Sequence, residues 1–522
     1  MIKPYSLLVL FFILILVGCQ KDNEPSPQQT KIAADNFNIA PDSILVNPYG
    51  YAPLTALVKF TLPQTGSTRI VVKGKNGVNS DIVHQFNDLG NSHSIPILGL
   101  YADFENTVEI SLINESGKTV ANSTIKIKTD PLPPILPSSI EVTTAKLEKM
   151  ENGLNLVSNF SRFYTGVALV PLMVDNYGDI RWLLDFSKHY ELSTLYFDCG
   201  ISRLKNGNYY FANGVTSKIY EVDGLGQIIN TWQMPGYTFH HEVFEKPDGN
   251  FLVSVNKNGS LNKSGAPTVE DYIIEINRKS GTIVNEWDLK ESLDENRTAL
   301  TSDSYDWIHV NAVNFDPSDN TIIISGRTQG VIKLTYDNRV KWILSPHKGW
   351  GKNRRGEDLN QFLLTPLDAN GNPITDHDIL LGNTNHSDFE WNWYQHSPII
   401  TPTGNLMLHD NGDIRNYNPS TEKYSRAVEY KINPAQKTVQ QIWSYGKERG
   451  LETFSRIVSS VKYLPKTNHV LFSSGFQVGN KNGKGGKVVE IDYTTKEVVF
   501  EMEISSPNNW GFHRTDRVDL YP

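Results

Sequence analysis

Residues 36–130 consist of short runs in which apolar and polar positions alternate. The clearest runs are "ALVKFTL", "TRIVVKG", "NTVEISLIN" and "STIKIKTD", and turns that contain Gly, Asn or Ser separate them. Alternation with a period of two is typical of strands that bury one face. The pattern therefore predicts a small antiparallel β-sandwich of the immunoglobulin-like type over residues 36–130. The next stretch, 131–139, is "PLPPILPSS" and predicts a stiff linker at a domain boundary.

From residue 140 onward a longer module recurs, with a polar turn, two strands and an outer strand that ends near tryptophan. The turn and first strand of the five complete copies are "KNGNYYFA", "PDGNFLVSVN", "PSDNTIIISGR", "PTGNLMLHDN" and "PKTNHVLFSSG". A sixth copy is split, because "VALVPLMVDNYGDIRWLLDF" has only the later strands and "GFHRTDRVDLYP" resembles the missing inner strand. Radial repetition in which distant segments share one blade closes a β-propeller without exposed sheet edges. We therefore predict an all-β chain with a six-bladed propeller over residues 140–522, with five or seven blades as alternatives.

The first residues of the sequence have the pattern of an export signal rather than of a folded domain. Lys3 precedes an apolar run from Leu7 to Val17, which is too short for an ordinary membrane span and is typical of a secretory signal. Gly18 followed by Cys19 resembles a bacterial lipobox, so we predict a signal peptide at 1–18, lipidation of Cys19 and a flexible tether at 19–35. A chance cysteine at the end of a signal peptide is the alternative. The lipoprotein reading implies anchoring to the outer membrane, on its periplasmic or cell-surface face.

Composition narrows the class of protein. The formal net charge of -8, with mixed charges, argues against a nucleic-acid-binding protein, which would present a basic face. The 27 Pro and 38 Gly are consistent with many turns between strands. Cys199 is the one other cysteine besides Cys19, so no intramolecular disulfide is predicted.

Histidines recur at one position of the repeat. His396, His241 and Cys199 stand eight positions before the turn glycines at 404, 249 and 207, and His309 stands at a similar offset in another copy. The innermost strand of each blade lines the central channel, so we expect the three histidines at about the same height around one axis.

We also predict the positions of four other histidines and of one arginine. We expect His240 to face away from the channel, because side chains alternate along a strand. His347 is expected at the surface of a connecting loop, and His386 and His409 are expected to be structural. Arg327 ends the second strand of the copy that carries His309, and we expect it to lean toward the same site.

Three chemical interpretations fit this set. Three neutral histidines could bind zinc and support a metal-dependent hydrolase or lyase, although the cationic Arg327 and the lack of a carboxylate other than Glu242 in these motifs disfavour a metal. Metal-free transfer of an anionic group fits better, since one imidazole can attack, a second can move a proton and an arginine can hold the anion. A propeller that binds a glycan or protein without catalysis is the third interpretation.

Two blocks of the sequence resemble the bacterial arylsulfate sulfotransferases. They are "DWIHVNAV…DNTIIISGRTQGVIKLTYDNRVKWILSP" and "WYQHSPIITPTGNLMLHDNGD", and the resemblance extends over most of the chain after the tether. It implies a small β-sandwich followed by a six-bladed propeller, a phenolic sulfate donor, a phenolic acceptor, no cofactor, no metal and a homodimer. One departure is that the loop just ahead of His396, "LGNTNHSDFEWNWYQH", contains no cysteine, whereas some members have a short-loop disulfide there.

The resemblance also implies residue roles. His396 would be the nucleophile that becomes a sulfohistidine in a ping-pong reaction, His241 and His309 would transfer protons and hold sulfate oxygens, and Arg327 would neutralise charge. Weaker candidates for binding the substrate are Arg514, Trp307 and Tyr394, the last two as aromatic rings that stack on an aryl group.

Overall fold

The computed structural model describes residues 35–134, 136–137, 139–160, 170–195, 200–506 and 511–522. The predicted signal peptide, Cys19, most of the tether and Cys199 lie outside these residues. Within them the chain is all-β apart from two four-residue α-helices and short 3-10 turns; the helices are α1 (Leu289–Ser292) and α2 (His377–Leu380). No helix among the described residues is long and apolar enough to cross a membrane.

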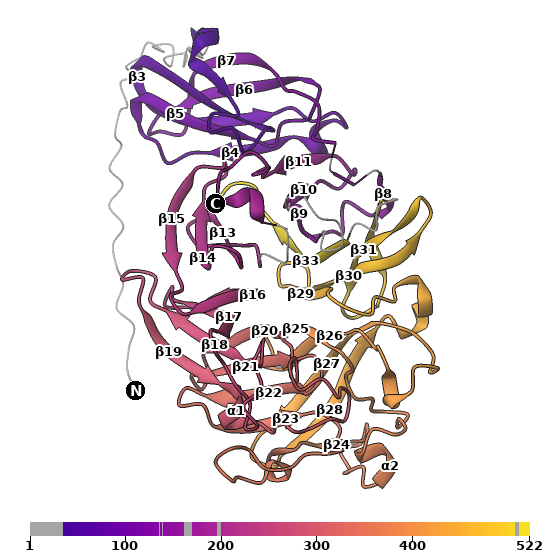
Figure 1. Ribbon diagram of the computed structural model, residues 1–522. Coiled ribbons are helices and arrows are strands. Elements are labelled where there is room, and N and C mark those ends of the chain that lie inside the picture. The colour runs from indigo at the N-terminus through magenta and orange to yellow at the C-terminus, as the bar shows by residue number, and fades with distance from the viewer. Residues whose placement is uncertain (1–34, 135, 138, 161–169, 196–199, 507–510) are drawn as a thin grey trace, which may run out of the picture.

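The N-terminal part is a β-sandwich, as predicted (Figure 1). Its strands are β1 (Asp35–Asn36), β2 (Ile44–Val46), β3 (Thr55–Val72), β4 (Ile82–Gln85), β5 (Gly90–Leu98), β6 (Glu105–Ile113) and β7 (Thr119–Lys128). The runs "ALVKFTL" and "TRIVVKG", expected as two strands, lie on the single long strand β3. Its first half pairs with β2 and β5, its second half pairs with β4 and β6, and a register shift between Thr61 and Gly66 separates the halves. One strand therefore contributes to both layers.

The rest of the described chain forms six sheets, which we call blades 1 to 6 in chain order. Blade 1 contains β33 (Gly511–Val518), β9 (Leu154–Phe160), β10 (Leu172–Val174) and β11 (Ile180–Leu183). Blade 2 contains β12 (Ser202–Arg203), β13 (Tyr209–Asn213), β14 (Lys218–Val222) and β15 (Ile228–Gln233). Blade 3 contains β16 (Tyr237–Glu245), β17 (Phe251–Lys257), β18 (Tyr272–Ile276) and β19 (Ile283–Asp288).

The later blades follow the same plan. Blade 4 contains β20 (Val310–Asp316), β21 (Thr321–Gly326), β22 (Gly330–Thr335) and β23 (Val340–Leu344). Blade 5 contains β25 (His396–Ile400), β26 (Leu406–Asp410), β27 (Arg426–Asn433) and β28 (Thr438–Tyr445), with β24 (Thr365–Leu367) added outside β28. Blade 6 contains β29 (Ser460–Leu464), β30 (His469–Asn480), β31 (Gly483–Asp492) and β32 (Val498–Ser506), with β8 (Ser139–Ala145) added outside β32.

The first strands of the blades converge on the middle of the molecule (Figure 1). β16 contacts β20, β20 contacts β25, β25 contacts β29, and β29 contacts β33. The expected split blade is present, because β33 from the end of the sequence is the inner strand next to β9. A second exchange was not expected: β8 leaves the linker and pairs with the outer strand of blade 6. The beginning and end of the propeller are thus joined at two adjacent blades.

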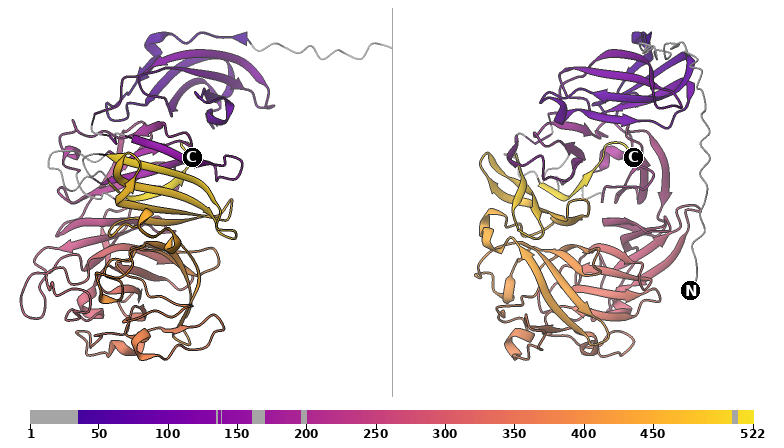
Figure 2. Two further views of the ribbon diagram at one scale, coloured as in Figure 1. Left: turned by 90° about the vertical axis from the view of Figure 1, so that its right-hand side faces the viewer. Right: turned by 180° about the vertical axis from the view of Figure 1, so that it is seen from behind.

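The sandwich packs on blade 1, as Figures 1 and 2 show from three sides. Arg181 of β11 is 1% exposed and donates to the carbonyl oxygen of Gly99 at 2.9 Å, to the hydroxyl of Tyr101 at 2.9 Å and to Asp175 at 3.0 Å. The hydroxyl of Tyr521 accepts from the backbone N–H of Leu98 at 2.7 Å. One continuous hydrophobic core runs through both parts. The sandwich therefore supports the blade in which the ring closes.

Candidate functional site

Five buried histidines meet where the inner strands converge, and we call them the histidine cluster: His240 and His241 of β16, His309 just before β20, His396 of β25 and His513 of β33. The ring centroids of His241 and His309 are 4.9 Å apart, those of His241 and His513 are 5.7 Å apart, and those of His396 and His513 are 5.9 Å apart. The structure thus brings together the three histidines predicted from the repeat. His513 is an addition that the turn-based register did not identify.

The inner strands are distorted at the histidines. The pairing of β16 with β17 shifts between Phe239 and Val243, and similar shifts interrupt β20, β25 and β33. His241 and His309 have φ values of 57° and 52°. L-residues seldom adopt this left-handed conformation, which costs about 1–3 kcal/mol and is concentrated at functional sites. The left-handed conformations of His241 and His309 therefore set the directions of these two side chains at an energetic cost.

The same bulge overturns the expectation for His240. Strict alternation would place His240 and His241 on opposite faces, but Nδ1 of His240 lies 3.1 Å from Nδ1 of His241, and one ring donates to the other. The left-handed residue breaks the alternation on which that expectation depended. Both rings therefore belong to the site.

His396 has its lone pair on a defined atom. Its Nδ1 is 2.8 Å from Oδ1 of Asn411 and 3.0 Å from the carbonyl oxygen of Tyr394, which are both acceptors. The Asn411 amide donates to the carbonyl oxygens of Ser455 and Val458, so its own oxygen faces the histidine. Nδ1 must therefore carry the proton, and the lone pair lies on Nε2. Burial, followed by the nearby His513, holds the pKa of His396 well below its usual value, so the ring is neutral.

The pKa of His309 is shifted in the opposite direction. Its Nδ1 is 2.7 Å from Oε2 of Glu270 and 2.6 Å from Oδ2 of Asp306. Burial alone would lower the pKa of His309, but the two carboxylates outweigh burial and raise the pKa above its usual value. The expectation that these motifs contain no carboxylate other than Glu242 is wrong, because Asp306 stands in the block "DWIHVNAV" itself. Glu270 comes from the segment that precedes β18.

Arg327 follows β21 and reaches the site as predicted. Its Nη2 lies 3.7 Å from Oδ2 of Asp306, and its guanidinium lies 5.8 Å from the ring centroid of Tyr394, the residue two positions before His396. The cation therefore lies between the segment of His309 and the segment of His396. An anion that contacts both histidines would also meet Arg327.

Trp307 does not lie at the mouth of the site, which corrects the expectation that it stacks on a substrate. It is 1% exposed, packs in the core between blades 3 and 4, and donates its indole N–H to Asp271 at 3.1 Å. Its large apolar surface is already buried, so none is left for a ligand.

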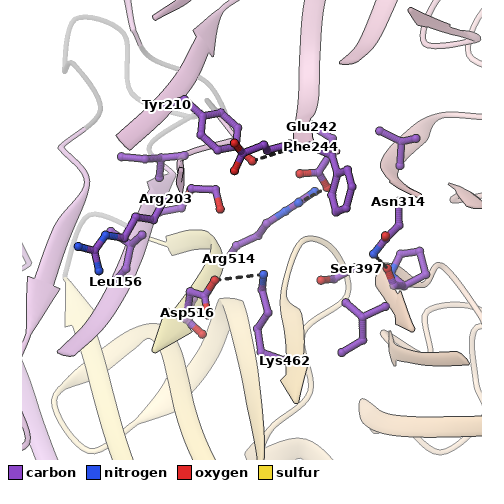
Figure 3. Close-up of a pocket in the computed structure, with 18 residues that line it drawn as sticks. Leu156, Arg203, Tyr210, Glu242, Phe244, Asn314, Ser397, Lys462, Arg514 and Asp516 are labelled. Carbon is purple, nitrogen blue, oxygen red and sulfur yellow. Dashed lines mark hydrogen bonds and ion pairs between the residues drawn. The ribbon is translucent and has the colours of Figure 1, made fainter. Parts of the chain in front are cut away.

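Arg514 is committed to protein partners rather than exposed to an anion (Figure 3). Its Nη1 pairs with Glu242, its Nη2 donates to the carbonyl oxygen of Asn311 at 3.0 Å, and its Nε donates to Nδ1 of His513 at 3.1 Å. Arg514 and Glu242 also line a cavity of about 190 Å³, whose lining includes none of the histidine cluster. The ion pair therefore borders this cavity, and Arg514 contacts the cluster through His513.

The remaining histidines have structural places. His409 is fully buried and stacks on Phe472, and Nδ1 of His386 accepts from the backbone N–H of Asp388 at 3.1 Å. His347 is not a plain surface residue as expected. It is half-buried, its Nε2 donates to the carbonyl oxygen of Leu364 at 3.0 Å, and its ring packs against Trp391.

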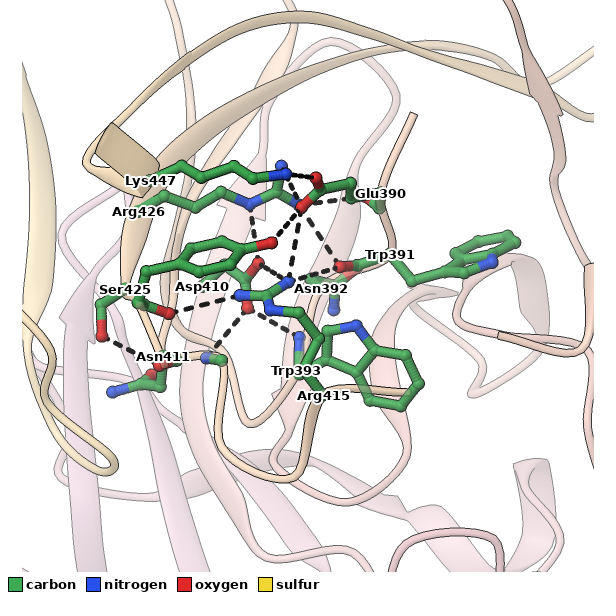
Figure 4. Close-up of polar contacts among 12 residues, drawn as sticks. Glu390, Trp391, Asn392, Trp393, Asp410, Asn411, Arg415, Ser425, Arg426 and Lys447 are labelled. Carbon is green, nitrogen blue, oxygen red and sulfur yellow. Dashed lines mark hydrogen bonds and ion pairs between the residues drawn. The ribbon is translucent and has the colours of Figure 1, made fainter. Parts of the chain in front are cut away.

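A buried ion network holds the segment that leads to His396 (Figure 4). Oδ2 of Asp410 accepts from Arg415 at 3.0 Å and from Arg426 at 2.8 Å, and all three side chains are at most 1% exposed. Oδ1 of Asp410 accepts from the backbone N–H of Trp393 at 2.8 Å. Arg426 and Arg415 also face Glu390, at 3.4 Å and 3.8 Å. Buried ion pairs thus hold this segment in place, as a short-loop disulfide would in the relatives that have one.

Blade 4 fixes the same segment from the other side. The side chain of Gln395 donates to the hydroxyl of Ser325 at 3.1 Å and to the carbonyl oxygen of Gly326 at 3.0 Å. The backbone carbonyl oxygen of Gln395 accepts from the side-chain amide of Asn311 at 2.9 Å. The position of His396 is therefore defined by contacts with two blades, which is the rigidity that a catalytic side chain requires.

We expect the substitution Asp410→Asn to lower the free energy of unfolding by about 3–5 kcal/mol, because it leaves two buried guanidinium groups without their shared carboxylate. Chemical denaturation of both proteins measures the difference. Asp413→Asn is the matched control, since Asp413 pairs at 3.1 Å with Arg456, whose side chain is 55% exposed, and should lose at most about 1 kcal/mol. Equal losses in the two variants would show that the network does not stabilise this segment.

Two groups of side chains have the composition of a metal site. They are His240, His241 and Glu270, and Glu270, Asp306 and His309. The second group holds an imidazole whose raised pKa favours the proton, and Arg327 lies beside it, so a bound cation would meet a positive environment. His396 belongs to neither group. The arrangement fits an anion that contacts the cations better than it fits a metal ion.

A cavity borders the histidine cluster at His240. It has a volume of about 300 Å³ and lies between blades 2 and 3, and its lining includes Ala212, Phe239, Asn256, His240 and Glu270. Its size and mixed lining suit one aromatic ring with a polar substituent.

Comparisons with known proteins identify the family. The family model described as Arylsulfotransferase (ASST) matches residues 139–513, and the model described as Arylsulfotransferase Ig-like domain matches residues 43–130. The chain is 31% identical to the arylsulfate sulfotransferase AssT of Escherichia coli O6:H1, over 91% of this chain and 93% of that protein. It is 30% identical to the protein of the same name from Lelliottia amnigena, over 89% and 90% of the two chains.

Similarity to a solved structure is lower in the following case. Virginiamycin B lyase from Staphylococcus aureus is 11% identical, with a TM-score of 0.29 over 74% of this chain and 88% of that one. Such a likeness carries no argument about function. The two family models and the two relatives cover the sandwich and the blades together, and they show that this chain belongs to the arylsulfotransferase family.

Proposed function

We propose that the chain transfers a sulfuryl group from a phenolic sulfate ester to a phenolic acceptor through a sulfohistidine on His396, without a metal. The observation that carries the proposal is that two buried histidines have opposite environments. His396 is neutral with its lone pair on Nε2, whereas the carboxylates of Glu270 and Asp306 contact Nδ1 of His309 and raise its pKa. Titratable groups whose pKa values are pushed apart indicate which group attacks and which donates a proton.

In the first half-reaction, Nε2 of His396 attacks the sulfur of the donor. The N–S bond forms as the S–O bond to the aryl group breaks, and the leaving oxygen takes a proton from His309. That proton comes from Nε2 of His309, because Nδ1 is bound by the two carboxylates. Arg327 balances the negative charge of the sulfuryl oxygens during the transfer.

The second half-reaction reverses these steps. The acceptor phenol gives its proton to the neutral His309, its oxygen attacks the sulfur, and the bond to Nε2 of His396 breaks. The aryl group of either substrate would occupy the cavity beside His240 and Glu270. Sulfuryl transfer suits the site because the group is monoanionic and one arginine with neutral or cationic imidazoles can balance it.

The intact mass of the protein tests the proposal. Brief mixing with 4-nitrophenyl sulfate in the absence of an acceptor should add about 80 Da, the mass of one SO₃ group on a covalent intermediate. Addition of phenol should then restore the original mass. No adduct, together with aryl sulfate turnover that a chelator abolishes, would contradict the proposal and favour the metal-dependent alternative. No turnover of any aryl sulfate would favour the binding-propeller alternative.

We also propose that the protein is an exported lipoprotein, anchored to the outer membrane through Cys19 and acting there as a homodimer. The apolar run before Gly18 and Cys19 supports the anchor, and family membership supports the dimer. Labelling of cells with a radioactive fatty acid should mark the wild type and leave Cys19→Ser unlabelled.

A further inference from the structure

We infer that His513 is a hydrogen-bond donor to the sulfuryl group and that Arg514, Glu242 and Asn311 position it for this role. The inference rests on the proposed function and extends it to a strand that contains none of the histidines found from the repeat. His513 is fully buried on β33, and its ring lies 5.9 Å from that of His396 and 5.7 Å from that of His241. It is the ring that connects the nucleophile to the rest of the histidine cluster.

The contact with Arg514 fixes the tautomer of His513. The guanidinium Nε carries a hydrogen and cannot accept, so Nδ1 of His513, at 3.1 Å, must be the acceptor. A neutral imidazole that accepts at Nδ1 carries its proton on Nε2. His513 therefore presents an N–H donor on the edge of the ring that faces away from Arg514.

The orientation of Arg514 is itself defined by two other blades. Glu242 of blade 3 pairs with its Nη1, and the carbonyl oxygen of Asn311 in blade 4 accepts from its Nη2. Asn311 in turn donates to Gln395, the residue before His396. The donor and the nucleophile are thus tied to one rigid set of contacts, which is how a protein fixes the geometry of a group in transfer.

The proposed role is distinct from that of the other histidines. His396 forms the bond to sulfur and His309 moves the proton, so neither is left to hold the sulfuryl oxygens on the side of β33. A neutral N–H donor can bind such an oxygen without delivering a proton to it. Loss of one preorganised donor to a reacting anion costs about 10²–10³ in rate.

The test compares three substitutions of His513 by the rate at which 4-nitrophenyl sulfate modifies His396 in a single turnover. His513→Gln places its amide N–H₂ near the position of Nε2, whereas His513→Asn reaches only the position of Nδ1, and His513→Phe fills the space without a donor. We expect the Asn and Phe variants to be slower by about 10²-fold. The Gln variant should stay within about tenfold of the wild type. A purely structural role predicts no such rescue.

His469→Gln is the control, because His469 is a buried histidine whose Nδ1 contacts Glu490 at 2.8 Å in blade 6, outside the histidine cluster. It should modify His396 at the wild-type rate even if its melting temperature falls. Equal rates in the Gln and Asn variants, or wild-type rates in all three, would overturn the role of His513 while the adduct on the wild type still upheld the proposed function. Absence of the adduct from the wild type would overturn both. If the Asn variant does not fold, the comparison of Gln with Phe decides.

Discussion

Replacement of His396 by asparagine should lower transfer from 4-nitrophenyl sulfate to phenol by at least about 10⁴-fold, the scale seen when an enzyme loses its nucleophile. The expected loss is the largest of any single substitution, because no other residue in the cluster combines a neutral ring with a lone pair fixed on Nε2. The asparagine side chain is small enough to fit the space and carries no nucleophilic nitrogen. Initial rates of nitrophenol release and intact mass measure the effect together.

His347→Asn is the matched control for this substitution. His347 is half-buried and hydrogen-bonded in the loop after blade 4, and the site does not use it. Its replacement should leave the rate unchanged and the adduct present. An adduct of equal size on the His396→Asn protein would assign the nucleophile to another member of the cluster.

The second large effect is expected at the carboxylates behind His309. Glu270→Gln and Asp306→Asn each remove a negative charge from Nδ1, so the pKa of His309 should fall and less of the proton donor should be present at neutral pH. Phenyl sulfate releases a phenol with a pKa of about 10. The departure of so basic a leaving group depends strongly on its protonation. We expect its turnover to fall by about 10²–10³-fold, within the range typical of general acid catalysis.

Two measurements identify this effect as proton transfer: the comparison of two sulfate esters and the dependence of activity on pH. Release of nitrophenolate, a much weaker base, should fall by less than about tenfold in the same variants. The pKa of His309 is raised in the wild type, so the acid form persists below that pKa and is lost as the pH rises through it. In the variants the alkaline fall in activity should therefore move to lower pH. Asp303→Asn, an exposed carboxylate three positions before Asp306, should change neither quantity, and equal losses with both donors would instead indicate a change in geometry.

The sequence predicted those site residues that stand at a repeated position of the blades. The turn glycines set a register, so His241 and His396 were found by counting, and His309 was found at a similar offset. The same count says nothing about Glu270, because this residue lies in a segment of variable length between strands and contacts His309 only through the packing of neighbouring blades. Asp306 stands three positions before His309 in the block "DWIHVNAV", so its contact is local and this spacing was the signal that could have found it. His513 lay in a segment recognised as the missing inner strand, and "FHR" beside "FHH" was the signal that could have found it.

Two of the wrong expectations, those for His240 and Trp307, share a reason: each applied a general rule at a position where local structure overrides it. Alternation along a strand misplaced His240, because a residue with φ of 57° interrupts β16. The preference of aromatic rings for ligand sites misplaced Trp307, because its indole N–H already has a buried acceptor in Asp271. The β-sandwich and the all-β repeat were predicted correctly, since alternation and turn composition operate over many residues and survive single exceptions.

The closure of blade 1 has a consequence for how the chain folds. Arg517 of β33 contacts Asn155 of β9 across a separation of 362 residues, and closing a loop of that length costs about 5 kcal/mol in chain entropy. Contacts of such long range form late and slow the folding rate. Because β33 also carries His513 and Arg514, the last event of ring closure is the one that assembles the histidine cluster. A folding intermediate with an open ring would lack the contacts of His396 with β33, so sulfuryl transfer should arise in step with the final cooperative phase of folding rather than before it.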